Sequence, residues 1–300
     1  MRRWRAALLA CVATAGAVAL PRAQDPSQRQ PTFRGGTDAV RVDVSVRENA
    51  KVIAGLTASD FQIYDNGVLQ QVADVSYGKL PIDVTVALDV SLSVGGQLLT
   101  NLRRAVLQLL SDLGPDDRLK LVTFNMRIAR IVDFTTSASD VEQAIRSAAA
   151  GGGTSVFDAI AVSLVSAAPL DRRQLVVLFT DGADSTSLAT PRLLVDIAQR
   201  TNTSLTSVVP SALVNAGTRG DPRARLLTLQ RLAGETGGSV IPVGSDLTAT
   251  FRRALDEFRS SYVLHFIPTG VTRAGFHTLD VRVKDRPKLT IRARRGYFGG

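Results

Sequence analysis

Valine alternates with polar residues from Val40 to Val46, which is the period-two pattern of a half-buried β-strand. Two further segments, Phe61–Tyr64 and Gln71–Val75, repeat this pattern on either side of Asp65-Asn66-Gly67. An Asn-Gly pair in this setting predicts a hairpin turn. Residues 38–80 are therefore expected to form a small N-terminal β region.

From Pro81 onward, short apolar runs alternate with segments of helical period. We expect strands at 82–90, 118–124, 128–134, 174–180, 204–209 and 239–242, and helices at 97–113, 139–149, 156–168, 190–201, 222–236 and 246–259. The first and fourth of these strands are almost wholly apolar, which is typical of strands covered on both faces. The fold class predicted for this part is α/β, with a doubly wound and mostly parallel sheet. Ser139, with Glu142 three residues later, is expected to cap one helix, and Pro191 to open another.

Strand patterns return after Ser260, at 262–266, 277–283 and 289–293. Each flank has too few strands to be stable alone. We therefore predict that the N-terminal β region and residues 261–300 pair with each other into one small β-sandwich. Residues 81–260 would then be a domain inserted into it.

The first 23 residues have the pattern of a secretory signal peptide. Basic residues at Met1–Arg5 precede an apolar stretch, Ala6–Leu20, and cleavage is expected after Ala19 or Ala23. An uncleaved membrane anchor and a lipoprotein signal at Cys11 are the weaker alternatives, because the apolar stretches are short for either. The polar segment 24–37 is expected to be a flexible leader. The sequence thus predicts an exported protein, located in the periplasm, the cell envelope or outside the cell.

Export changes how cysteine and charge are interpreted. Cys11 is the only cysteine and lies within the signal, so the exported chain would have no thiol for a disulfide or for covalent catalysis. The formal net charge is +9, and loss of four arginines with the signal leaves 9 − 4 = +5. Seven basic residues gather near the C-terminus: Arg282, Lys284, Arg286, Lys288, Arg292, Arg294 and Arg295. We interpret them as solvated strand positions, with an anionic envelope polymer or lipid headgroup as the alternative, and expect no nucleic-acid binding.

Oxygen-bearing side chains follow two of the apolar strands. Asp89, Ser91 and Ser93 come at the end of the strand that begins at Ile82, and Asp181 ends the run Leu175–Thr180. In an extended segment, Asp89, Ser91 and Ser93 would point to the same side. Carboxyl ends of neighbouring parallel strands meet at one rim, where ligands bind in doubly wound sheets.

Thr154 closes the glycine run Gly151–Gly153, whose lack of side chains permits close approach to that rim. Hydroxyls and carboxylates without His or Cys suit a hard divalent cation such as Mg²⁺, with Mn²⁺ or Ca²⁺ as alternatives.

Other interpretations of these residues are weaker. Asp89, Ser91 and Ser93 could simply cap the following helix, and Asp184 could lie in the outer shell of the cation or stabilise a turn. The glycine run could cradle a phosphate, but the lysine of a P-loop is absent. The chain has two histidines, His265 and His277, both in predicted β segments away from the rim. A Ser-His-Asp arrangement or a histidine-ligated zinc site is therefore not expected.

Residues 81–260 resemble a von Willebrand factor A domain, whose metal-ion-dependent adhesion site (MIDAS) has the motif Asp-x-Ser-x-Ser followed by a Thr and an Asp. All five positions match, at Asp89, Ser91, Ser93, Thr154 and Asp181. Many family members have Gly where this chain has Leu92, which is not a ligand position and bears on loop shape. The segments Gly55–Phe61 and Arg294–Phe298 also resemble exported bacterial proteins related to this family.

The resemblance implies a function. Ser91, Ser93 and Thr154 would supply hydroxyl ligands, and Asp89 and Asp181 would act directly or through water. The chain would be a non-catalytic, adhesion-type module that captures a carboxylate of a protein partner. The alternative is a structural or assembly subunit of an envelope complex, in which the ion only braces the loops. Membrane attachment is expected only if the signal is uncleaved.

Overall fold

The computed structural model describes residues 39–49, 51–165, 169, 171–215, 221–244 and 246–299. The predicted signal, 1–23, and leader, 24–37, lie outside the described residues. Residues 38–300 belong to a single unit of the chain. None of the helices among the described residues is long and apolar enough to cross a membrane.

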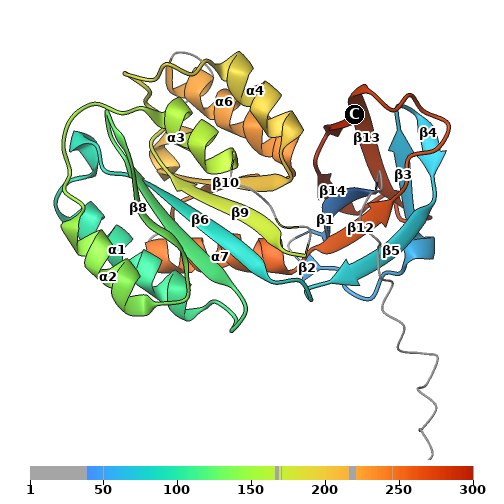
Figure 1. The fold of residues 1–300 in the computed structure, drawn as a ribbon, viewed down its shortest axis with the longest axis horizontal. Coiled ribbons are helices and arrows are strands. Elements are labelled where there is room, and N and C mark those ends of the chain that lie inside the picture. Colours follow the sequence, from blue (N-terminus) through green and yellow to red (C-terminus); the bar gives the residue numbers. More distant parts are fainter. Residues whose placement is uncertain are drawn as a thin grey trace, which may run out of the picture. The chain divides into compact units, whose positions relative to one another are not determined.

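A six-stranded sheet forms the centre of the α/β part (Figure 1). Its strands are β6 (Ile82–Asp89), β7 (Arg118–Phe124), β8 (Ile128–Thr135), β9 (Arg173–Phe179), β10 (Thr203–Val209) and β11 (Ser239–Pro242). They lie in the order β11-β10-β9-β6-β7-β8, and all neighbours are parallel except β7 and β8. Every residue of β6 and β9 is buried. The mostly parallel sheet predicted from the apolar runs is confirmed.

Helices cover both faces of this sheet. They are α1 (Gln97–Ser111), α2 (Ala138–Ser147), α3 (Val156–Leu164), α4 (Pro191–Arg200), α5 (Ser211–Val214), α6 (Asp221–Thr236) and α7 (Leu247–Arg259). Apolar residues of α1, α2 and α7 form one core with the sheet, and those of α3, α4, α5 and α6 form another. Figure 1 shows α3, α4 and α6 on one face and α1, α2 and α7 on the other. The fold is therefore doubly wound.

The two flanks of the chain build a β-sandwich. One sheet has the order β14-β1-β12-β5, with β2 paired to β1, and the other has the order β15-β13-β3-β4. The strands are β1 (Val40–Glu48), β2 (Lys51–Val52), β3 (Phe61–Asp65), β4 (Val68–Gln70), β5 (Val72–Tyr77), β12 (Tyr262–Phe266), β13 (Gly275–Val283), β14 (Thr290–Ala293) and β15 (Gly296–Gly299). Val44 of β1 pairs with Tyr262 of β12, and Ile63 of β3 with Val281 of β13. The predicted sandwich of N-terminal and C-terminal strands is thus confirmed.

Several local predictions need correction. The turn Asn66-Gly67 has positive φ at both residues and joins β3 to the short strand β4, whereas the segment 71–75 belongs to β5 in the other sheet. The cap of α2 is Ser137, whose Oγ accepts a hydrogen bond from the Asp140 N–H, so the prediction of Ser139 was wrong. Pro191 opens α4 as expected, after the cap residue Thr190. Helix α5 and strands β2, β4 and β15 were not predicted.

Asp83 in β6 carries a buried charge at the amino end of the sheet. It is fully buried, and its carboxylate accepts hydrogen bonds from Arg118 Nη2 at 2.7 Å, Arg172 Nε at 2.7 Å and Gln174 Nε2 at 2.9 Å. Burial acts to raise the pKa of Asp83, but these hydrogen bonds and the charge of Arg172 outweigh it and hold the pKa below its usual value.

The low pKa of Asp83 predicts a loss of stability in acid. Because the folded pKa lies below the unfolded value of about 3.9, the carboxylate stabilises the fold above that pH. The contribution is lost as pH falls through the folded pKa. We expect the free energy of unfolding, measured by urea titration between about pH 5 and pH 2.5, to fall less steeply for Asp83→Asn than for the parent. Asp116→Asn, which changes an exposed carboxylate nearby, is the control and should retain the parent slope; equal slopes in all three proteins would contradict the prediction.

Candidate metal centre

Three loops meet at the carboxyl ends of β6 and β9. The two strands are parallel neighbours with Leu88 opposite Phe179, so Asp89, the last residue of β6, and Asp181, which follows β9, end at the same rim. The glycine loop is tied to this rim by two backbone hydrogen bonds. Gly151 N–H donates to Val90 O at 2.9 Å, and Leu92 N–H donates to Gly152 O at 3.2 Å. The loop carrying Thr154 is therefore held against the loop carrying Asp89.

The Asp89 loop brings two hydroxyls together. Asp89 is fully buried, and its Oδ1 accepts a hydrogen bond from Ser91 N–H at 2.8 Å. Residues 92–94 form a 3-10 turn, so the expectation of an extended segment was wrong beyond Ser91. The turn nevertheless places Ser91 Oγ 3.1 Å from Ser93 Oγ. Helix α1 is capped by Gly96 without a side-chain bond, which removes the interpretation that these residues cap that helix.

Thr180 is a residue of this site that sequence reasoning missed. Its Oγ1 donates to Asp89 Oδ2 at 3.2 Å and accepts from Gly182 N–H at 3.0 Å. Asp181 Oδ1 accepts from Ala183 N–H at 2.9 Å. Gly182 has a φ of 76°, a left-handed conformation that favours glycine. Thr180 thus fixes the buried carboxylate of Asp89 to the loop that carries Asp181.

Thr154 is buried, and hydrogen bonds occupy its backbone. Its N–H donates to Ser185 Oγ at 2.9 Å, and its carbonyl accepts from the N–H groups of Ser185 and Thr186. Within the part of the chain that the structure describes, its hydroxyl makes no hydrogen bond. Asp184 Oδ1 accepts from Phe157 N–H at 3.2 Å and from Ser187 Oγ at 2.5 Å, which assigns Asp184 to bracing this loop against α3.

The electrostatics of the rim are those of a site short of positive charge. Burial raises the pKa of Asp89, and the nearby charge of Asp181 raises it further against the opposing hydrogen bonds from Ser91 and Thr180. Among the described residues, no group of three or more His, Cys, Asp or Glu side chains could hold a metal ion. A cation bound here would therefore depend on the hydroxyls of Ser91, Ser93 and Thr154. This donor set of three hydroxyls and two carboxylates fits a hard divalent cation.

Three large apolar side chains on the loops of this rim are exposed. Leu92 follows Ser91 and is 76% exposed, Leu188 follows the Asp181 loop and is 92% exposed, and Met126 in the β7–β8 turn is 56% exposed. Met126 lies beside the glycine loop, since a Cβ added to Gly152 would be 3.3 Å from its Sδ.

A family model described as von Willebrand factor type A domain matches residues 83–235. Inter-alpha-trypsin inhibitor heavy chain H4 from Sus scrofa is 28% identical over 174 residues, which cover 54% of this chain and 18% of that protein. The chain thus spans about a fifth of the length of this relative.

Two solved structures are also similar to this chain. A von Willebrand factor type A structure from Catenulispora acidiphila has a TM-score of 0.48 and 12% identity, covering 89% of this chain and 75% of that chain. Proximal thread matrix protein 1 from the mussel byssus, solved with a zinc-occupied MIDAS motif, has a TM-score of 0.48 and 15% identity, covering 63% and 48% of the two chains.

Proposed function

Because this chain belongs to the von Willebrand factor type A domain family, we propose that it is an exported, non-catalytic module that captures an acidic side chain of a partner protein through a divalent cation. Domains of this family are generally interaction modules with a cation at the MIDAS motif. The observation that carries the proposal is the meeting of the Asp89, Thr154 and Asp181 loops at one rim of the sheet.

The cation would be held by this chain's own oxygen atoms. Ser91, Ser93 and Thr154 would offer hydroxyls, and Asp89 and Asp181 would offer carboxylates, directly or through water. Mg²⁺ is the expected ion, because it accepts a few hard oxygen ligands and retains waters, with Mn²⁺ or Ca²⁺ as alternatives. Bound there, it supplies a positive charge that attracts a carboxylate. The exposed Leu92, Leu188 and Met126 favour a partner with apolar side chains beside its acidic residue.

The second candidate is a structural or assembly subunit of an envelope complex, in which the ion only braces the loops. The observation that favours it is the burial of Asp89 beside the charge of Asp181, since a cation between them would stabilise the fold without any partner. The two candidates differ in what Asp181 does. In the binding module it contributes to partner capture, and in the structural subunit it contributes only to stability.

Peptide capture tests the proposal. A phage-displayed library of random peptides, selected on the protein in Mg²⁺ and eluted with EDTA, is expected to yield peptides that contain Asp or Glu. Changing that residue to Asn or Gln in the peptide, or Asp181→Asn in the protein, should weaken binding about a hundredfold. Asp171→Asn, an exposed carboxylate before the other end of β9, is the control.

The peptide experiment distinguishes the two candidates. Equal peptide affinity in Mg²⁺ and EDTA would rule out capture through a cation. If Asp181→Asn lowers thermal stability in Mg²⁺ and no acidic peptide is selected, the structural subunit is the better description.

A further inference from the structure

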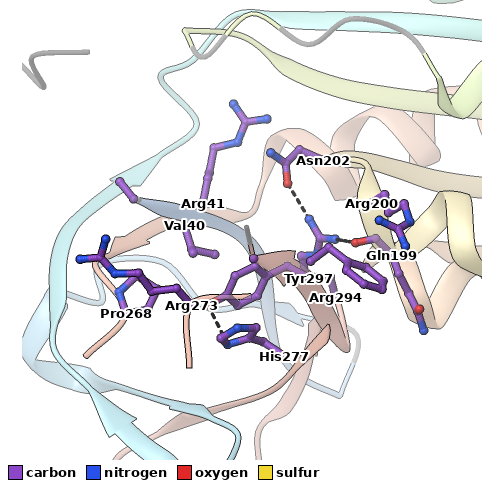
Figure 2. A pocket seen from close by; sticks show the side chains of 13 residues that line it. Val40, Arg41, Gln199, Arg200, Asn202, Pro268, Arg273, His277, Arg294 and Tyr297 are labelled. Atoms are coloured by element: carbon purple, nitrogen blue, oxygen red, sulfur yellow. Dashed lines mark hydrogen bonds between the residues drawn. The ribbon is translucent and has the colours of Figure 1, made fainter. Parts of the chain in front are cut away.

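A cavity of about 340 Å³ lies at the opposite end of the central sheet from Asp89. One side is formed by the end of α4 and the residue before β10, namely Gln199, Arg200 and Asn202. The other side is formed by the sandwich, with His277 on β13 and Tyr297 on β15. In Figure 2 the Arg294 side chain lies between Asn202 and Gln199, and Tyr297 and His277 lie together. The volume is in the range of sites for small molecules.

The charged side chains that line this cavity are all positive. They are Arg41, Arg200, Arg273 and Arg294, and no Asp or Glu is among the described lining residues. Arg200 lies at the end of α4, with its guanidinium 3.7 Å from the ring centroid of Phe298. Its Nε forms an exposed ion pair with Asp196 Oδ1 at 3.1 Å, so the Nη atoms are the donors that remain for a ligand. Arg41 donates from Nη1 to Arg172 O at 2.7 Å, so its guanidinium is turned away from the cavity (Figure 2). The charges of Arg200 and Arg294 give the cavity a positive potential that attracts an anion.

Arg294 is a buried cation whose hydrogen bonds go only to neutral acceptors. It is 7% exposed, and it donates from Nε to Gly296 O at 2.6 Å, from Nη1 to Asn202 Oδ1 at 2.5 Å and from Nη2 to Gln199 O at 2.8 Å. Burial lowers the pKa of Arg294 to about 10, although the charges of Asp43 and Glu235 act from a distance to raise it. Within the described part of the chain no carboxylate forms an ion pair with it. The expectation that Arg294 is a solvated strand residue was wrong.

His277 provides a second, independent sign of a missing ligand. Its ring is 1% exposed, and Nδ1 lies 2.8 Å from Asp65 Oδ1, while Tyr297 O–H donates to Asp65 Oδ2 at 2.7 Å. The other ring nitrogen, Nε2, is buried and has no hydrogen-bond partner among the described residues. A Cβ added to Gly299, which lines the cavity, would lie 3.0 Å from Nε2. An unpaired buried nitrogen is rare, because it loses its bond to water without a replacement.

We propose that this cavity binds a small organic anion with a carboxylate or phosphate group, held by Arg294 and Arg200 and hydrogen-bonded to His277 Nε2. A guanidinium group can donate two parallel hydrogen bonds to two oxygens of a carboxylate or of a phosphate group. Because Nδ1–H donates to Asp65, Nε2 is left as an acceptor and can accept a hydrogen bond from a hydroxyl of the ligand, such as that of citrate or of a hydrogen phosphate. The rings of Tyr297 and Phe298 offer apolar contact to the rest of the ligand. The site is independent of the proposed cation site, since it shares no residue with it.

Imidazole NMR of the whole chain tests this proposal, because the sequence contains only His265 and His277. Citrate and inorganic phosphate are titrated separately, each against sodium chloride at the same ionic strength. We expect a saturable shift of the His277 ring nitrogens with citrate, phosphate or both, and little change at His265, which lies on β12 outside the cavity. The comparison shows which anionic group the site prefers.

Two variants on α4 form a matched pair. Arg200→Gln removes a lining cation from an exposed helix position and is expected to weaken binding about tenfold. Arg192→Gln makes the same change at an exposed residue of α4 that does not line the cavity, and should bind as the parent does. Arg294→Lys keeps the charge but loses the fork, and should also weaken binding where it folds. No saturable shift at His277, a shift equal to that in chloride, or unchanged affinity in Arg200→Gln would overturn the proposal.

Discussion

Mg²⁺ at about 100 times its dissociation constant is expected to raise the free energy of unfolding by roughly 2.7 kcal/mol relative to EDTA, because a ligand that binds only the native state stabilises it by mass action. The structural reason is the rim itself. Asp89 is buried near Asp181, and hydroxyls of Ser91 and Ser93 lie 3.1 Å apart beside them, so a folded chain without a cation holds like charges together. Thermal unfolding in EDTA and then in Mg²⁺, Mn²⁺ or Ca²⁺ measures the effect.

The double variant Ser91→Ala, Ser93→Ala separates this site from nonspecific effects of divalent ions. It keeps both carboxylates but removes two proposed ligands, so its metal-dependent stabilisation should be lost. Ser111→Ala, Ser139→Ala makes the same chemical change at exposed positions elsewhere and should respond as the parent does. No metal-dependent shift in the parent would mean that the five-residue motif holds no ion in the free protein.

Replacing Arg173 by Met is expected to lower the free energy of unfolding by about 3–5 kcal/mol, the range for breaking a buried ion pair. Arg173 is 1% exposed at the start of β9. Its Nε lies 2.6 Å from Asp43 Oδ1 in β1, and its Nη2 donates to Phe258 O at 2.9 Å and to Ser261 Oγ at 2.6 Å. The guanidinium also lies 4.0 Å from the ring centroid of Phe258. One side chain therefore joins the central sheet, the end of α7 and the sandwich.

Urea titration at neutral pH measures this loss. Arg192→Met, which changes an exposed arginine of α4, should alter stability by less than about 0.5 kcal/mol. Adding Asp43→Asn to Arg173→Met should recover part of the loss, since it removes the carboxylate left without its partner. A loss below about 1 kcal/mol for Arg173→Met alone would show that packing, and not this ion pair, holds the junction.

The elements that the sequence predicted well have strong local signals. Continuous apolar runs such as 82–90 marked the buried strands, and Asn66-Gly67 marked a turn that requires positive φ. Helix α5 was missed because a four-residue helix shows no periodicity. The cap of α2 was misplaced by two residues, because Ser137 and Ser139 are chemically equal and only the backbone decides between them.

The two sites also differ in how much of each is set by local sequence signals and how much by contacts between distant residues. That Asp89 and Asp181 end at one rim could be predicted because both follow apolar strands, and the pairing of β6 with β9 puts those ends together. Thr180 was missed because it was counted as the last residue of its strand, although its hydroxyl turns to Asp89. The arginine-lined cavity could not be predicted. It depends on contacts between residues far apart in the chain, such as Arg294 with Gln199 and His277 with Asp65.

The pairing of the first strand of the sandwich with the last part of the chain determines the order of events during synthesis. Val44 in β1 pairs with Tyr262 in β12 and with Ala293 in β14. Strand β1 therefore cannot form these pairs until both of those later residues have been synthesised. Closing so long a loop is entropically unfavourable in an unfolded chain, but a central domain that has already folded brings its own two ends together. We therefore expect nascent chains that stop before Tyr262 to contain a folded α/β core with unpaired N-terminal strands, which are open to aggregation or proteolysis until translation is complete.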